Sequence, residues 1–244
     1  MMINRKISAF VVVLIMVYYC NAQNFIYKGS ITYERKIQMH KILEGNSWFK
    51  GNMDNIPKFY VSQFQLRFSP DTTVYNKTSD DEPNSASWAV YAKDNEIISL
   101  LYSRQCISKK NIWNDTYIIK DSLRSYKWKL VNETRKIAGI ECKKATTIIN
   151  DSVYIVAFYA ENIMVSGGPE QFNGLPGMIL GIVVPRLHVS YYAQKVDANE
   201  NQLITLPKQK SKSIMTRKEF QEMIMKNLKW EFTNASLGVL YLFI

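Results

Sequence analysis

The sequence predicts a mainly β (α+β) protein: one large curved antiparallel sheet, a half-barrel or bowl, with a C-terminal helix packed on it. Three observations lead to this fold class. Apolar and polar side chains alternate with period two along many short segments, turn-forming residues separate these segments, and only one late segment has helical spacing. The 244 residues are 47% hydrophobic and 21% charged, which excludes the disordered and collagen-like classes.

A cleaved signal peptide is predicted over residues 1–22. Arg5 and Lys6 give a positive start, and an apolar run of 13 residues, Ile7–Tyr19, leads to the small-residue pattern of Cys20–Ala22. This run is shorter than the ~20 apolar residues that a membrane-spanning helix needs. We therefore expect an exported protein, periplasmic, associated with the outer membrane or secreted, with no transmembrane segment after removal of the signal.

The first strand is predicted to begin at Gly29. Its inward side chains are Ile31, Tyr33, Ile37 and Met39, and its outward ones are Thr32, Glu34, Lys36, Gln38 and His40. A hairpin follows, with strands at 64–68 and 73–75 on either side of the turn Ser69–Thr72, where Pro70 favours the turn.

Further strands are predicted wherever apolar or alternating segments lie between turn-formers. They are residues 97–106, 116–120, 127–131, 140–149, 153–160, 178–184, 187–196 and 202–206. Residues 153–160 are apolar on both faces, which is typical of a central strand covered on both sides.

We predict one β-rich domain over residues 23–206, because no linker divides it, followed at 207–244 by a basic linker, an amphipathic helix and an apolar tail packed on the same domain. Thr216 and Glu219 have the spacing of a capping box at the start of the helix. The helical apolar stripe is Phe220, Met223, Ile224 and Leu228. The basic run Lys208–Lys218 has no interleaved aromatic residues, so we interpret it as solvated and expect no nucleic-acid partner.

The motifs of common catalytic sites are missing from the sequence, and we predict no catalytic residues, no metal and no cofactor. There are only two histidines, His40 and His188, too few for a His-rich metal site. His188 is expected to be polar or pocket-facing rather than a general base. A hydrolase site assembled in space from His188, Ser190 and an acidic turn is the alternative.

A glycine-rich stretch over residues 166–181 holds five of the ten glycines and is the candidate ligand-binding loop. Its candidate residues, with His188 from the neighbouring segment, are Gly167, Gly168, Pro169, Gly174, Leu175, Pro176, Gly177 and His188. Pro176 and Gly177 fit the middle of a type II turn. The alternative is a purely structural tight corner leading into the next strand.

Two cysteines, Cys106 and Cys142, are left after removal of the signal peptide. In an oxidising compartment they can form a disulfide, but their separation along the chain does not establish proximity. The alternative is two buried thiols that pack as small apolar groups.

Several motifs, in order along the chain, resemble those of the GLPGLI family of signal-peptide-bearing proteins from Gram-negative bacteria. They are Gly29–Glu34, Trp128–Leu130 with Glu133, Ile137–Ala145, Ser166–Pro169 and Gly174–Ile179, where Met178 replaces a leucine. This resemblance covers roughly residues 29–196. It implies a β-rich, bowl-like domain of a kind that also precedes some secreted glycan-releasing amidases, and it supplies no catalytic residues to carry over.

The function that the sequence favours is that of a non-catalytic envelope binding or accessory protein rather than an enzyme. Its aromatic content of 13% and its β pattern favour an apolar or extended ligand, or an envelope protein partner, on a concave β surface. The alternatives are the secreted hydrolase described above and a purely structural envelope component.

Overall fold

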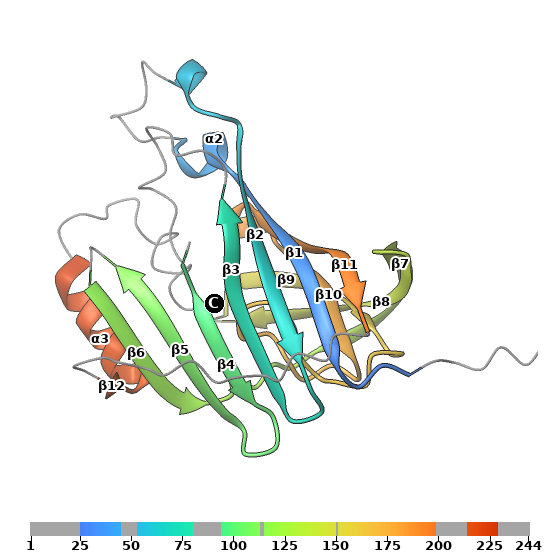
Figure 1. Ribbon diagram of the computed structural model, residues 1–244. Helices are drawn as coiled ribbons and strands as arrows, with labels where there is room; N and C mark the ends of the chain where they lie inside the picture. Colours follow the sequence, from blue (N-terminus) through green and yellow to red (C-terminus); the bar gives the residue numbers. More distant parts are fainter. Residues whose placement is uncertain are drawn as a thin grey trace, which may run out of the picture.

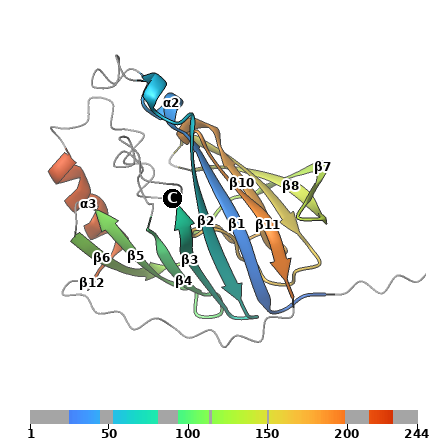
Figure 2. The ribbon, with the colours of Figure 1, turned by 45° about the horizontal axis from the view of Figure 1, so that its top comes forward.

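The computed structural model describes residues 25–44, 53–80, 94–112, 115–149, 151–198 and 214–228. They form one open sheet of twelve strands in the order β12-β6-β5-β4-β3-β2-β1-β11-β10-β9-β8-β7. The sheet curves strongly (Figures 1 and 2), and in the view of Figure 1 β8 and β9 cross behind β1 and β2. The predicted fold class, a large curved sheet with a C-terminal helix, is confirmed.

The strands are β1 (Gly29–Gln38), β2 (Phe59–Phe68), β3 (Thr72–Asp80), β4 (Glu96–Leu100), β5 (Gln105–Ile112), β6 (Asp115–Ser122), β7 (Lys129–Ile137), β8 (Ile140–Ile149), β9 (Val153–Ala160), β10 (Met178–Val184), β11 (Val189–Asp197) and β12 (Ile214–Met215). The helical segments are α2 (Met39–Ile42), η2 (Met53–Asn55), η4 (Pro185–Leu187) and α3 (Arg217–Leu228). Among the described strands, only the short β12 pairs in parallel, with β6.

Strands β8, β9 and β10 have the predicted bounds, but residues 97–106 form two strands rather than one. A turn separates β4 from β5, with Tyr102 almost fully exposed at its tip and Arg104 in the left-handed region at φ 52°. The predicted signal peptide, the strand at 202–206, most of the basic linker and the apolar tail lie outside the described residues.

Alternation along β1 buries Ile31, Tyr33 and Ile37 as predicted. Arg35 occupies the remaining inward position and is fully buried as well. The strand ends at Gln38, so His40 lies in α2 instead of pointing outward from a strand. It is half-buried, with Nε2 2.7 Å from the carbonyl oxygen of Ile56.

Strand β9 is covered on both faces over its second half, as its two-sided apolar sequence predicts, whereas near its start Tyr154 is 46% exposed. Ile155 and Ala157 belong to one cluster of buried apolar side chains, which also holds Leu175 from the β9–β10 connection. Phe158 and Ala160 belong to a second cluster, together with Phe64 of β2. Burial of a large apolar side chain contributes about 2 kcal/mol, so these two clusters are the main stabilising core.

Helix α3 begins with the predicted capping box and packs on the sheet. Glu219 N donates to Thr216 Oγ1 at 3.2 Å, and Thr216 N donates to Glu219 Oε2 at 2.7 Å. Phe220 and Ile224 are buried against Ile119 of β6. No helix in the described part of the chain is long and apolar enough to cross a membrane.

The two cysteines are buried and free, which is the alternative to a disulfide that the sequence left open. Burial raises the pKa of the Cys106 thiol to about 11 and that of Cys142 to about 12. Both thiols therefore stay protonated near neutral pH, as buried structural cysteines do.

Candidate functional site

One face of the sheet, here called the inner face, is the face on which the β9–β10 connection (residues 161–177) and α3 pack. Directly opposite residues of an antiparallel pair share a face. Cross-strand pairing therefore places Tyr191, Arg35 and Ser62 together on the inner face of β11, β1 and β2. All three side chains are buried. An unusual number of polar side chains is buried among the described residues: Ser30, Arg35, Ser62, Thr72, Thr73, Asn95, Ser99, Ser108, Lys110, Thr146, Thr147, Glu170, Gln171 and Asn173.

Glu170 lies at the centre of the inner-face cluster, which we define as Arg35, Asn95, Lys110, Glu170 and Tyr191. Asn95 Nδ2 donates to Glu170 Oε2 at 2.8 Å, and the Tyr191 hydroxyl donates to Oε1 at 3.3 Å. Burial raises the pKa of the Glu170 carboxyl, whereas the charges of Lys110 and Arg35 and these hydrogen bonds oppose the rise. Glu170 also has a left-handed φ of 54°, which costs a non-glycine residue about 1–2 kcal/mol.

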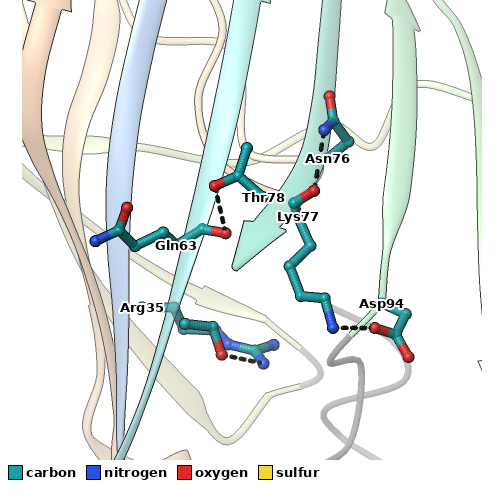
Figure 3. Close-up of polar contacts among 7 residues, drawn as sticks. Arg35, Gln63, Asn76, Lys77, Thr78 and Asp94 are labelled. Carbon is teal, nitrogen blue, oxygen red and sulfur yellow. Dashed lines mark hydrogen bonds and ion pairs between the residues drawn. The ribbon is translucent and has the colours of Figure 1, made fainter. Parts of the chain in front are cut away.

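Arg35 brings a buried positive charge to the cluster from the middle of β1. One guanidinium nitrogen donates to Ser62 Oγ at 3.3 Å, and the guanidinium carbon lies 4.9 Å from the centre of the Phe64 ring. Figure 3 shows Arg35 with the more exposed ion pair of Lys77 and Asp94, which joins β3 to the segment that leads into β4. A hydroxyl and an aromatic face therefore help to fix the Arg35 side chain.

Lys110 is the second buried cation of the cluster. It is 3% exposed, and its Nζ has no hydrogen-bond partner among the described residues. Burial lowers the pKa of Lys110 to about 8; the positive charges of Arg124 and Arg217 lower it further, whereas Glu170 opposes the shift. A buried ammonium without a hydrogen bond is costly, which marks this position as a binding or catalytic candidate.

The predicted loop is largely buried and holds the chain against the inner face. Its buried members are Gly167, Gly168, Pro169, Leu175 and Gly177, and its exposed members are Gly174 and Pro176. Asn173 Nδ2 donates to the Arg124 carbonyl at 3.1 Å, and Trp128 Nε1 donates to the Asn173 carbonyl at 2.8 Å. The glycines shape the corner, while the polar residues between them, Glu170, Gln171 and Asn173, reach the inner face.

The predicted type II turn at Pro176 and Gly177 is wrong. The Gly177 amide donates to the Leu175 carbonyl at 2.8 Å, which closes a three-residue turn around Pro176. The Met178 amide, which would close a type II turn, donates instead to the Ile163 carbonyl. This bond fixes the loop to its own first residues.

His188 lies at the end of η4, just before β11. It is half-buried, has a left-handed φ of 52° and ends η4 with its amide donating to the Pro185 carbonyl at 3.0 Å. Ser190 pairs with Lys36 on the outer face. In the described ranges, no hydrogen bond joins the His188 side chain to Ser190 or to a carboxylate, so the hydrolase site imagined from the sequence is not assembled there.

Sequence reasoning missed Arg35, Lys110 and Glu170. Arg35 could have been found, because it occupies an inward position between Tyr33 and Ile37. Glu170 lies inside the loop that the sequence singled out. No such signal marked Lys110. Over the described residues, no group of three or more metal-ligating side chains comes together.

These features define a β-rich module with one open curved sheet and a buried polar cluster on its inner face. The chain belongs to the family described as "N-glycanase peptide, N-terminal domain", whose model matches residues 77–216, more than half of the sequence. The GLPGLI resemblance is not tested by this match and stays a prediction.

Solved structures share the fold. The chain is similar to PNGF-II in space group C2, with a TM-score of 0.52, 19% identity and coverage of 82% of this chain and 33% of that one. It is also similar to PNGF-II in space group P21, with a TM-score of 0.52, 18% identity and coverage of 82% and 34%. The chain thus spans about a third of the length of these structures. Among curated proteins, none matches it.

Proposed function

We propose that the chain is an exported, non-catalytic binding module whose inner face holds an extended, polar ligand, either a glycan or a glycan-bearing peptide. Two lines of evidence support the proposal. The family is that of an N-glycanase N-terminal domain, and the buried inner face presents hydrogen-bonding groups rather than an unbroken apolar surface. Export and membership of the GLPGLI family are parts of the same proposal.

The observation that carries the proposal is the inner-face cluster around Glu170. Burying polar groups costs about 1–3 kcal/mol for each group that is left without a hydrogen bond. A fold used only as a scaffold gains nothing from such groups, whereas a binding site uses them to orient a ligand. The polar character of this face also favours a hydrophilic ligand over the apolar one that the sequence left open.

The test is isothermal titration calorimetry of the exported chain with three probes: an N-glycosylated peptide, the same peptide without its glycan, and the free oligosaccharide. We expect a glycan-containing probe to bind, and the Glu170→Gln variant to bind it about tenfold more weakly, equivalent to ~1.4 kcal/mol. The matched control is Glu161→Gln, from the same connection, whose carboxylate forms an exposed ion pair with Lys143 at 2.8 Å.

Each outcome decides one part of the proposal. Absence of binding by all three probes would contradict a glycan-binding module and favour the purely structural alternative. Cleavage of the glycopeptide during the titration, detected by mass spectrometry, would show an enzyme instead. Equal loss of affinity in Glu170→Gln and Glu161→Gln would place the site away from the inner face.

A further inference from the structure

Several buried polar groups around Glu170 have no hydrogen-bond partner among the described residues, among them Lys110 Nζ and the hydroxyls of Tyr75 and Tyr126. Of these, Lys110 and Tyr126 are the two whose pKa values also respond to the charges of Arg124 and Arg217. Burial raises the pKa of Tyr126 to about 12, so this hydroxyl keeps its proton at neutral pH. Lys110 and Tyr126 are therefore both hydrogen-bond donors under these conditions. A buried donor without an acceptor is unfavourable, so a ligand that supplies an acceptor would be stabilised here.

Three residues with cationic side chains, from three different parts of the chain, lie around one short stretch of the β9–β10 connection, Glu170–Asn173. Arg217, at the start of α3, donates from one guanidinium nitrogen to the Ser122 carbonyl at 2.8 Å and to Gln171 Oε1 at 3.4 Å. The carbonyl of Arg124, between β6 and β7, accepts from Asn173. Lys109 of β5 pairs with Glu96 of β4, so the residues next to these two, Lys110 and Asn95, lie beside each other. Asn95 in turn donates a hydrogen bond to Glu170.

Among the described residues, the positive charges in this region outnumber the negative ones. Lys110, Arg124 and Arg217 are the cations, and Glu170 and Asp121 are the two carboxylates near them. Asp121 accepts from the amides of Arg217 and Ser122. After burial, the neighbouring cations are among the causes that lower the pKa of both Lys110 and Arg124. Like charges held this close repel one another, and a bound anion would remove the repulsion.

Solvent reaches this region at the two arginines. Arg124 and Arg217 are half-buried, whereas Lys110 is buried. Guanidinium groups bind planar oxyanions through paired N–H donors, and an ammonium adds a point charge. The arrangement therefore suits an oxyanion that enters between the arginines and reaches Lys110.

From these contacts we propose that Lys110, Arg124 and Arg217, with the Tyr126 hydroxyl, form an oxyanion subsite that binds the carboxylate, sulfate or phosphate group of an acidic ligand. The inference rests on the proposed function and deepens it, because it assigns the glycan or glycopeptide an acidic substituent. The inner-face cluster would hold the neutral part of the ligand, and the subsite its charged group.

The test titrates the full exported chain with three probes, sodium phosphate, sodium sulfate and sodium glucuronate, against sodium chloride at matched ionic strength and pH 7. Binding is followed by calorimetry and by the rise in melting temperature.

We expect at least one oxyanion to bind, and Lys110→Met to weaken its affinity at least about tenfold. Lys109→Met is the control, because it removes a cation from the outer face of the same strand and should change the affinity by less than about twofold. The three probes distinguish a carboxylated, a sulfated and a phosphorylated ligand.

Lys110→Met should fold, because it replaces a buried charge without a hydrogen bond by an apolar side chain of similar length. Absence of oxyanion binding by the wild type, or an equal effect of the Lys110 and Lys109 variants, would overturn the subsite. Binding of neutral glycopeptides alone would overturn it and leave the proposed function intact. Binding of oxyanions without binding of any glycopeptide would support the subsite and contradict the proposed function.

Discussion

The two halves of the sheet bury different kinds of side chain. Strands β9 and β10 bury apolar groups on both faces, among them Ile155, Phe158 and Ile182. Strands β4 and β5 bury polar groups as well: Ser99, Ser108 and Lys110 lie on the inner face, beside the buried Ile97 and Cys106. Both halves belong to one continuous sheet with the same pleated backbone, so the difference lies in the side chains alone.

This difference separates stability from binding within one fold. Each large apolar side chain buried in the β9–β10 half adds about 2 kcal/mol of stability. Each polar group in the β4–β5 half adds little when it is bonded and costs stability when it is not. The apolar half can therefore carry the fold, while the polar half keeps groups that are useful only when a ligand pairs with them.

The β9–β10 connection joins the two halves. Phe172 and Leu175 pack into the apolar cluster of the β9–β10 half. Just before them in the chain, Glu170 and Gln171 turn toward the polar half, where they contact Asn95 and Arg217. The position of the polar residues therefore depends on the packing of the apolar ones, and the sharp corner at the end of the connection is its most sensitive point.

The largest expected change in stability is that of Gly177→Ala, which adds a side chain at this corner, next to the end of β9. A Cβ at this position would lie 2.2 Å from the Ala160 carbonyl oxygen, and φ is +147°. Because the clash is with backbone, we expect the free energy of unfolding to fall by at least about 3 kcal/mol. Urea denaturation followed by circular dichroism measures this change.

The control for the corner is Gly174→Ala, which lies in the same connection at φ +90° with only the Trp128 ring nearby, at 3.6 Å. It carries backbone strain without a clash, so we expect a loss of about 1–2 kcal/mol. Equal losses for the two variants would show that the corner does not depend on close packing, and the link between the two halves would then be weaker than described.

The next effect tests the polar half through pH. Lys110 has a folded-state pKa of about 8, below its ordinary value of 10.5. Between these values the unfolded chain binds more protons than the folded one, so Lys110 makes the free energy of unfolding rise with pH, by up to about 3 kcal/mol. Lys110→Met should be more stable than the wild type at pH 7, and this advantage should shrink as the pH rises from 8 to 10.5.

Comparing the two proteins at each pH cancels the titration of groups that the Lys110 charge does not reach. Burial raises the pKa of Cys106 to about 11, so Cys106 lowers stability as the pH rises above 9; its burial is common to both proteins, and the Lys110 charge is a smaller cause that opposes this rise. The measurement is urea denaturation at pH 7, 8, 9 and 10. A constant stability difference across this range would mean that Lys110 is not desolvated in the folded protein.

The apolar half was largely predictable from the sequence, because its strands are continuous apolar runs bounded by turn-formers. Strands β8, β9 and β10 were therefore predicted with their observed bounds. The polar half was harder. The turn between β4 and β5 went unpredicted, because Leu101 and Tyr102 continue an apolar run through it, and Tyr102 is 95% exposed.

The candidate site was predictable only in part, for a related reason. Alternation along β1 places Arg35 inward, and the glycine-rich stretch includes Glu170. Lys110, in contrast, lies among the polar residues of β5, a pattern that predicts exposure. Its burial arises because the β9–β10 connection folds onto β5 from far along the chain, and a local pattern holds no information about that contact.

The smallest expected effect concerns α3, the helical cover that brings Arg217 to the polar half. Thr216→Ala removes the hydroxyl that accepts from the Glu219 amide at 3.2 Å. Loss of such a cap costs about 1 kcal/mol, and it should speed hydrogen exchange at the Glu219 amide. Thr116→Ala is the control, because its exposed hydroxyl donates to Asn111 on the β5–β6 hairpin and caps no helix.

If oxyanion affinity falls with Thr216→Ala but not with Thr116→Ala, the start of α3 positions Arg217 for binding. Unchanged exchange at Glu219 would show that the capping box does not hold this end of the helix, and the Asp121 carboxylate, which accepts from the Arg217 amide at 2.9 Å, would then be the group that does.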